Sequence, residues 1–138
     1  MRKLLFVYID LNENQKAIDY SNELLDKYPN DPDLYYNVGV LYQRLTLDTF
    51  DPVRELFLST TEESPAETIR EVYNSFVTAR KYAYNSKDYF LQASDLELDE
   101  NISTHEAVNE MRTLMDQIDE IFIPSIRETA RSAGLELE

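Results

Sequence analysis

Acidic side chains are the groups in this sequence with the most evident chemical potential. They are adjacent at Glu62-Glu63 and Asp119-Glu120, and they alternate at Asp95, Glu97 and Asp99. Paired carboxylates can perform acid–base catalysis or bind Ca²⁺. The chain has no Asp-x-Asp-x-Asp-Gly loop, and the last two of these acids fall at an expected helix end rather than in a cleft. We therefore interpret all of them as solvated surface charge.

The small numbers of cysteine, histidine and glycine exclude several other kinds of catalytic and cofactor-binding site. It has no cysteine, which excludes disulfides, thiolate metal sites and thiol nucleophiles. Its one histidine, His105, cannot form a His-pair zinc site, and no recognisable Ser-His-Asp motif includes it. Two glycines are too few for the glycine-rich loops that cradle phosphates. The sequence therefore predicts no enzyme, no catalytic residues, no metal and no cofactor.

Composition indicates one globular domain of strongly acidic character. The 138 residues are 43% hydrophobic and 29% charged, which suffices for a core. The 13 basic and 27 acidic residues give a net charge of −14, which repels phosphate backbones and argues against nucleic-acid binding. No segment approaches the roughly 18 apolar residues of a membrane span, so no membrane insertion is expected.

The N-terminal sequence leaves the compartment undetermined. Residues 4–9 form an apolar run after Arg2 and Lys3, which faintly resembles a signal peptide. The run stops at Asp10, however, and no small-residue cleavage site for a signal peptidase follows. Leu4 already lies in a helical pattern with no cap before it, which suggests an excised piece of a longer chain. A cytoplasmic location is therefore only the default.

Helical spacing dominates the whole chain, and strict two-residue alternation is absent. Proline after a capping residue, at Asp31-Pro32 and Ser64-Pro65, marks two helix starts. Gly134 marks a helix end, and Pro124 should break or kink the helix before it. The pattern predicts helices over residues 4–11, 15–28, 32–45, 53–58, 65–98 (with weakening at Asn85-Ser86), 103–122 and 125–133.

The first two expected helix hairpins show an internal sequence repeat. Four pairs of apolar or aromatic residues share an offset of 34: Leu4 with Val38, Val7 with Leu41, Tyr8 with Tyr42, and Leu11 with Leu45. A period of 34 residues with two helices per period is the signature of tetratricopeptide repeats.

The segment from Asn14 to Leu45 resembles the tetratricopeptide repeat family. The resemblance is carried by Gln15-Lys16-Ala17-Ile18-Asp19-Tyr20, Tyr28-Pro29-Asn30-Asp31-Pro32 and Leu34-Tyr35-Tyr36-Asn37-Val38-Gly39-Val40-Leu41-Tyr42. It implies an all-α fold in which antiparallel helix hairpins stack into a right-handed superhelix. Ala17 and Gly39 would be small because the paired helices approach closely at those positions.

The chain also departs from the repeat pattern. Leu5 stands where a small residue is expected, and Ser21 replaces an aromatic. About 40 residues follow Thr46 before the pattern resumes at residues 89–101. We therefore divide a single domain of residues 1–138 into a repeat core (1–45), an inserted helical segment (46–88) and C-terminal repeat-like helices (89–134).

The resemblance implies a binding surface on the concave face, which first helices line in this family. Carried over by position, the peptide-binding candidates are Phe6, Ile9, Tyr36, Asn37, Val40, Gln43 and Arg44. Aromatic area combined with amide and guanidinium groups suits a peptide. The alternative is that these are ordinary surface residues beside a helix covered by the insertion.

Tyrosine is abundant, with ten residues against six phenylalanines. Tyr73, Tyr82, Tyr84 and Tyr89 could form a recognition surface. We favour a simpler interpretation, in which they edge the core and their hydroxyls reach water.

The sequence thus predicts a protein-interaction module that binds a peptide or protein segment of unknown identity. The alternative is a purely structural domain that caps a longer repeat array or forms a homodimer. A dimer would use either the exposed N-terminal repeat end or the long helix over residues 65–98, whose apolar stripe must be buried.

Overall fold

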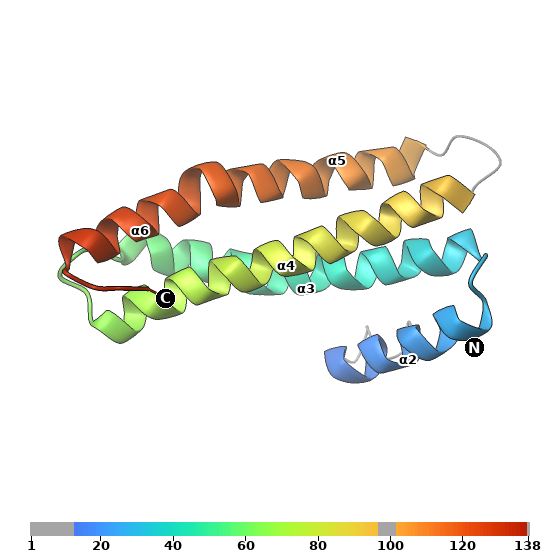
Figure 1. Cartoon of the computed structure of the whole chain (residues 1–138), viewed down its shortest axis with the longest axis horizontal. Helices are drawn as coiled ribbons and strands as arrows, with labels where there is room; N and C mark the ends of the chain where they lie inside the picture. Colours follow the sequence, from blue (N-terminus) through green and yellow to red (C-terminus); the bar gives the residue numbers. More distant parts are fainter. Residues whose placement is uncertain (1–12, 97–101, 138) are drawn as a thin grey trace.

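The computed structural model describes residues 13–96 and 102–137, and its regular structure there is helical without any β-strand. This confirms the all-α prediction. Along the chain lie α2 (Asn14–Lys27), α3 (Pro32–Ser59), α4 (Ala66–Leu96), α5 (Ile102–Gln117), the π-helical turn η1 (Ile118–Phe122) and α6 (Ile123–Ser132). The helices α2, α3 and α4 and the continuous run from α5 to α6 alternate in direction, and α4 lies beside α3 and the α5–α6 run (Figure 1). The candidates Phe6 and Ile9 and the expected helix over residues 4–11 lie outside the described residues.

The junction between α2 and α3 forms as its sequence predicts. The Asp31 carboxylate accepts hydrogen bonds from the backbone N–H groups of Asp33 at 3.1 Å and Leu34 at 3.3 Å, which is N-cap geometry. Pro32 occupies the first turn of α3, where its missing N–H would have no helical partner. The Tyr35 hydroxyl donates to the Pro29 carbonyl oxygen at 3.0 Å and ties α3 back to the connection.

The α3 helix continues to Ser59, so the prediction of a separate helix over residues 53–58 is wrong. Pro52 lies inside α3, where a proline costs about 3 kcal/mol by removing a backbone hydrogen bond and crowding the preceding turn. Phe50 and Val53 flank it and are only 5% and 3% exposed. Burying two such side chains contributes roughly 3–6 kcal/mol. Packing therefore keeps both sides of the proline in one helix, and residues 46–59 lengthen α3.

The α3 and α4 helices approach closely at Gly39. A Cβ atom placed at Gly39 would lie 2.6 Å from Cδ1 of the fully buried Phe90 ring. The buried Ser86 hydroxyl donates to the Gly39 carbonyl oxygen at 2.7 Å. The expected weakening at Asn85-Ser86 is therefore wrong, because Ser86 bonds across to α3 and α4 runs unbroken from Ala66 to Leu96.

The run from α5 to α6 changes its helical pitch before Pro124. In η1 the Ile123 N–H donates to the Ile118 carbonyl oxygen, five residues back. This wider turn accommodates the proline, which cannot donate to the preceding turn. The helical run continues through Pro124, so the structure shows a change of pitch there and the predicted break is wrong. Gly134 ends the run with φ +71°, and the Leu135 N–H donates to the Ala130 carbonyl oxygen at 2.8 Å. This is a glycine-terminated helix end of the Schellman type.

The α4 helix is central to the core. Its buried residues Ile69, Val72, Phe76, Ala79 and Ala83 pack among buried side chains of α3, α5 and α6. A second cluster joins α2 to the N-terminal half of α3 through residues such as Ala17, Leu24, Leu34 and Leu41. The apolar stripe of the long helix is thus covered within the chain.

Candidate functional site

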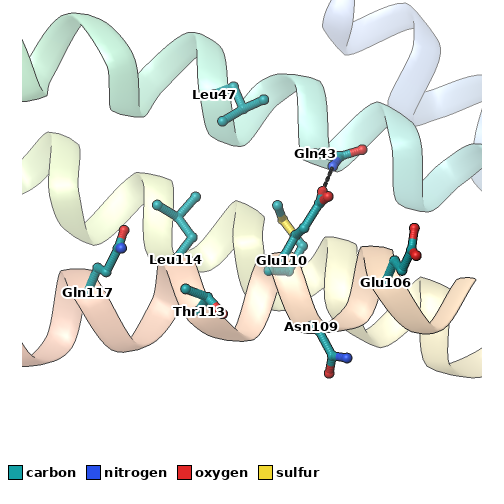
Figure 2. Close-up of a pocket in the computed structure, with 9 residues that line it drawn as sticks. Gln43, Leu47, Glu106, Asn109, Glu110, Thr113, Leu114 and Gln117 are labelled. Carbon is teal, nitrogen blue, oxygen red and sulfur yellow. Dashed lines mark hydrogen bonds between the residues drawn. The ribbon is translucent and has the colours of Figure 1, made fainter. Parts of the chain in front are cut away.

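A groove of about 530 Å³ separates α3 from α5 (Figure 2). Both helices pack against α4, which passes behind the groove. The groove is lined by Gln43, Leu47, Glu106, Asn109, Glu110, Met111, Thr113, Leu114 and Gln117. Two residues come from α3 and seven from α5, so the site exists only because the fold brings these two helices together.

One hydrogen bond spans the groove. The Gln43 side-chain amide donates to a Glu110 carboxylate oxygen at 3.2 Å, and Figure 2 shows this bond crossing from one wall to the other. It joins residues 67 positions apart in the sequence. The bond therefore helps to fix the separation of α3 and α5 at this point.

The interior of the groove is apolar. Met111 and Leu114 are 3% and 9% exposed and form part of its floor, whereas Leu47 on the opposite wall is 41% exposed. The side chains of Leu47 and Leu114 point into the space between the helices (Figure 2). Leu47 is therefore the one apolar residue of the lining with an exposed side chain.

The rim of the groove is acidic. Glu106 and Glu110 are exposed and lie one helical turn apart on α5. The other polar lining residues are neutral, and none of the nine lining residues is basic. Like charges spaced four residues apart on a helix repel each other by a few tenths of a kcal/mol. A cationic group bound at this rim would relieve that repulsion.

Three of the sequence-predicted residues share one stripe of α3. Tyr36 and Gln43 are seven residues apart, which is about two helical turns, and Val40 lies between them. Tyr36 and Val40 pack against the main core, with the Tyr36 ring centroid 5.3 Å from that of Phe90. Of the five predicted residues that the structure describes, only Gln43 lines the groove.

Asn37 and Arg44 lie on a different stripe of α3. Each is one residue further along than Tyr36 or Gln43, and is therefore rotated by about 100° around the helix axis. Asn37 is half-buried and Arg44 is exposed, and neither lines the groove. The structure therefore does not bring the five candidates that it describes together as one surface.

Sequence reasoning missed Leu47 and the entire α5 wall. The available signal for Leu47 is its position four residues after Gln43 and seven after Val40, which places it on the same stripe. The polar positions of α5 at 106, 109, 110, 113 and 117 also recur at helical spacing. Nothing in the sequence, however, indicates that this polar stripe faces α3.

Tyrosines form a stacked cluster at the edge of the core rather than in the groove. The rings of Tyr42 and Tyr89 stack with centroids 5.5 Å apart, and Tyr35 and Tyr82 flank them. Burial raises the pKa of both Tyr42 and Tyr89 above the ordinary value of 10.0, and neighbouring tyrosines and Asp88 raise it further. These contacts agree with the interpretation that most tyrosines edge the core, although Tyr84 is 48% exposed.

Another hollow, of about 360 Å³, lies on α4 and has basic character. It is lined by Arg80, Lys81, Tyr84 and Asn85. The Arg80 guanidinium is paired with Asp119 of η1 at 2.6 Å. This hollow therefore differs in charge from the groove between α3 and α5.

The described residues contain no group of three or more histidine or acidic side chains arranged to hold a metal ion. His105 is exposed on α5. Within the same residues, no helix has the length and apolar character needed to cross a membrane.

Comparison of the chain with protein-family models, curated proteins and solved structures yields no match. The tetratricopeptide resemblance and the binding function that it implies therefore stay predictions.

Proposed function

We propose that this chain is a non-catalytic protein-interaction module, which holds a peptide or protein segment in the groove between α3 and α5. The observation that carries the proposal is that the groove is open. Residues 46–59 lengthen α3 and do not fill the groove, and Leu47 within that segment exposes apolar area between polar walls. A hollow that combines apolar area with surrounding polar groups suits the contact with a peptide or protein segment.

We further propose that the helices form a tetratricopeptide-like right-handed stack. In this arrangement α3 and α5 are first helices, and α2 and α4 are second helices. The close approach of α3 and α4 at Gly39 supports the pairing, as does the complete burial of Ala17 between α2 and α3. The groove would then lie on the concave face, which first helices line in the family that the sequence resembles.

A pair of matched variants tests the binding function. Leu47→Gln removes apolar area from the groove, and Leu58→Gln makes the same change at a leucine of α3 that is 71% exposed and does not line the groove. Both substitutions leave the net charge unchanged. Affinity capture from the native extract is run in parallel with the unmodified chain and both variants. We expect one partner to be retained by the unmodified chain and Leu58→Gln but lost from Leu47→Gln.

Equal retention by both variants would remove the groove proposal. It would favour the alternative of a purely structural or self-associating domain. Circular dichroism of each variant checks that the helical content is unchanged. Sedimentation of the unmodified chain then measures whether it self-associates.

A further inference from the structure

We infer that the segment held in the groove is a basic amphipathic helix. This inference rests on the proposed function and specifies the chemistry of the partner. It follows from three properties of the groove: the backbone groups of its walls, the length of its lining and the sign of its charge.

The walls of the groove offer no backbone partners to an extended peptide. Both walls are formed by interior turns of α3 and α5, where backbone N–H and C=O groups are already bonded within each helix. An extended strand needs a sheet edge for its own backbone groups. A helix satisfies its backbone internally and needs only side-chain contacts, which is the form of recognition that this groove permits.

The length of the lining suits about three turns of a helix. The lining of α5 runs from Glu106 to Gln117, and these eleven steps at about 1.5 Å each span roughly 17 Å. A helical segment of that length presents two or three apolar side chains at spacings of three and four residues. Those side chains would contact Leu47, Leu114 and Met111.

The charge of the groove selects lysine and arginine for the polar positions of that helix. Glu106 and Glu110 are the two acidic residues among the nine that line the groove. Glu110 accepts a hydrogen bond across the groove from the Gln43 amide, and an amide carries no positive charge that would offset an acidic side chain. The net charge of −14 adds a long-range attraction for cations. An acidic or neutral helix would gain none of this energy.

A set of three synthetic peptides tests the inference. Each has 18 residues in an amphipathic helical pattern, with leucine on one face and lysine, glutamine or glutamate on the other. Binding is measured by fluorescence anisotropy at low salt, and the contact surface is mapped by chemical-shift changes of backbone amides. We expect the lysine peptide to bind most tightly and to shift signals of residues 43–47 and 106–117.

Matched charge reversals separate groove binding from general attraction to an acidic protein. Glu106→Lys with Glu110→Lys reverses two charges in the groove. Glu62→Lys with Glu63→Lys reverses two exposed charges in the α3–α4 connection and changes the net charge equally. We expect the first pair to weaken binding of the lysine peptide about tenfold and the second by less than about twofold. The groove reversal should also improve binding of the glutamate peptide.

Each outcome of these measurements decides the inference. Equal weakening by both reversals would overturn it, because the attraction would then be non-specific. Binding of the glutamine peptide in the groove as tightly as the lysine peptide would also overturn it, while the proposed binding function would stand. If no peptide changes the amide chemical shifts of residues 43–47 and 106–117, the inference is overturned, whatever the capture experiment shows. The proposed function would then depend on the Leu47→Gln comparison alone.

Discussion

Replacing Gly39 with alanine tests how closely α3 and α4 approach. On an exposed helix surface this change stabilises by about 1 kcal/mol, because alanine has the higher helix propensity. At this site the new Cβ would lie 2.6, 2.7 and 3.0 Å from three carbon atoms of the Phe90 ring. The ring is fully buried and lies against Tyr36, so it cannot swing away without disturbing the core.

The expected magnitude follows from these two opposing effects. Overpacking in a rigid core costs about 2–3 kcal/mol, the upper part of the usual range. After subtraction of the propensity gain, Gly39→Ala should lower the free energy of unfolding by about 1–2 kcal/mol. For a chain of 138 residues this corresponds to a fall in Tm of about 3–8 °C. Urea denaturation measures the free energy of unfolding and thermal denaturation measures Tm, each followed by circular dichroism.

A double-mutant cycle links this loss to the Phe90 ring. Phe90→Leu makes room for the added methyl group, so the double variant should be more stable than the sum of the single effects predicts, by about 1 kcal/mol. Gly134→Ala is the control, because it strains a backbone at φ +71° with no atom within 4 Å. Its effect should add independently to that of Phe90→Leu. Stabilisation by Gly39→Ala would refute the close approach of the helices.

Three further outcomes are expected. Ser86→Ala removes the buried hydrogen bond to the Gly39 carbonyl oxygen, so urea denaturation should show a free energy of unfolding lower by about 1 kcal/mol. An unchanged free energy of unfolding would contradict a contribution of this hydrogen bond to the contact between α3 and α4. Because folding raises the pKa values of Tyr42 and Tyr89, their contribution to the free energy of unfolding should be constant below pH 10 and fall as the pH rises above 10. Urea denaturation midpoints measured below and above pH 10 check this. A midpoint that rises above pH 10 would be incompatible with buried phenols. Asp119→Asn breaks a pair whose partners are each 39% exposed, so it should cost less than about 1 kcal/mol in thermal denaturation, and a larger loss would show that solvent does not screen it.

Local sequence signals predicted much of the helical framework. The cap at Asp31 and the stop at Gly134 depend on backbone chemistry that single residues determine. The apolar stripe of α5 and η1 also follows its spacing: Val108, Met111, Leu114, Met115 and Ile118 are buried, and Phe122 is partly buried. These features could be predicted because each depends on neighbours within a few residues along the chain.

Features that depend on tertiary contacts could not be predicted in the same way. Pro52 indicated a break, but burial of Phe50 and Val53 outweighs its local cost. Ser86 looked like a weak point in a helix, whereas its hydroxyl bonds to a residue 47 positions away.

The groove also depends on tertiary contacts, and for that reason the sequence alone could not predict it. Gln43 could be identified from the repeat pattern, but its opposite wall at Glu110 belongs to α5, which the pattern hardly covers. Leu47 was assigned to the insertion because the repeat period ends before it. The packing of both helices on α4 determines the site, and neither helix carries that information alone.

Hydrogen exchange of the protein bound to its captured partner shows where on the protein the bound segment lies. Amides of exposed groove turns exchange more slowly when a segment covers them. We expect new protection at residues 43–47 of α3 and 106–117 of α5. Protection confined to the basic hollow at residues 80–85 of α4, with the groove unchanged, would contradict it.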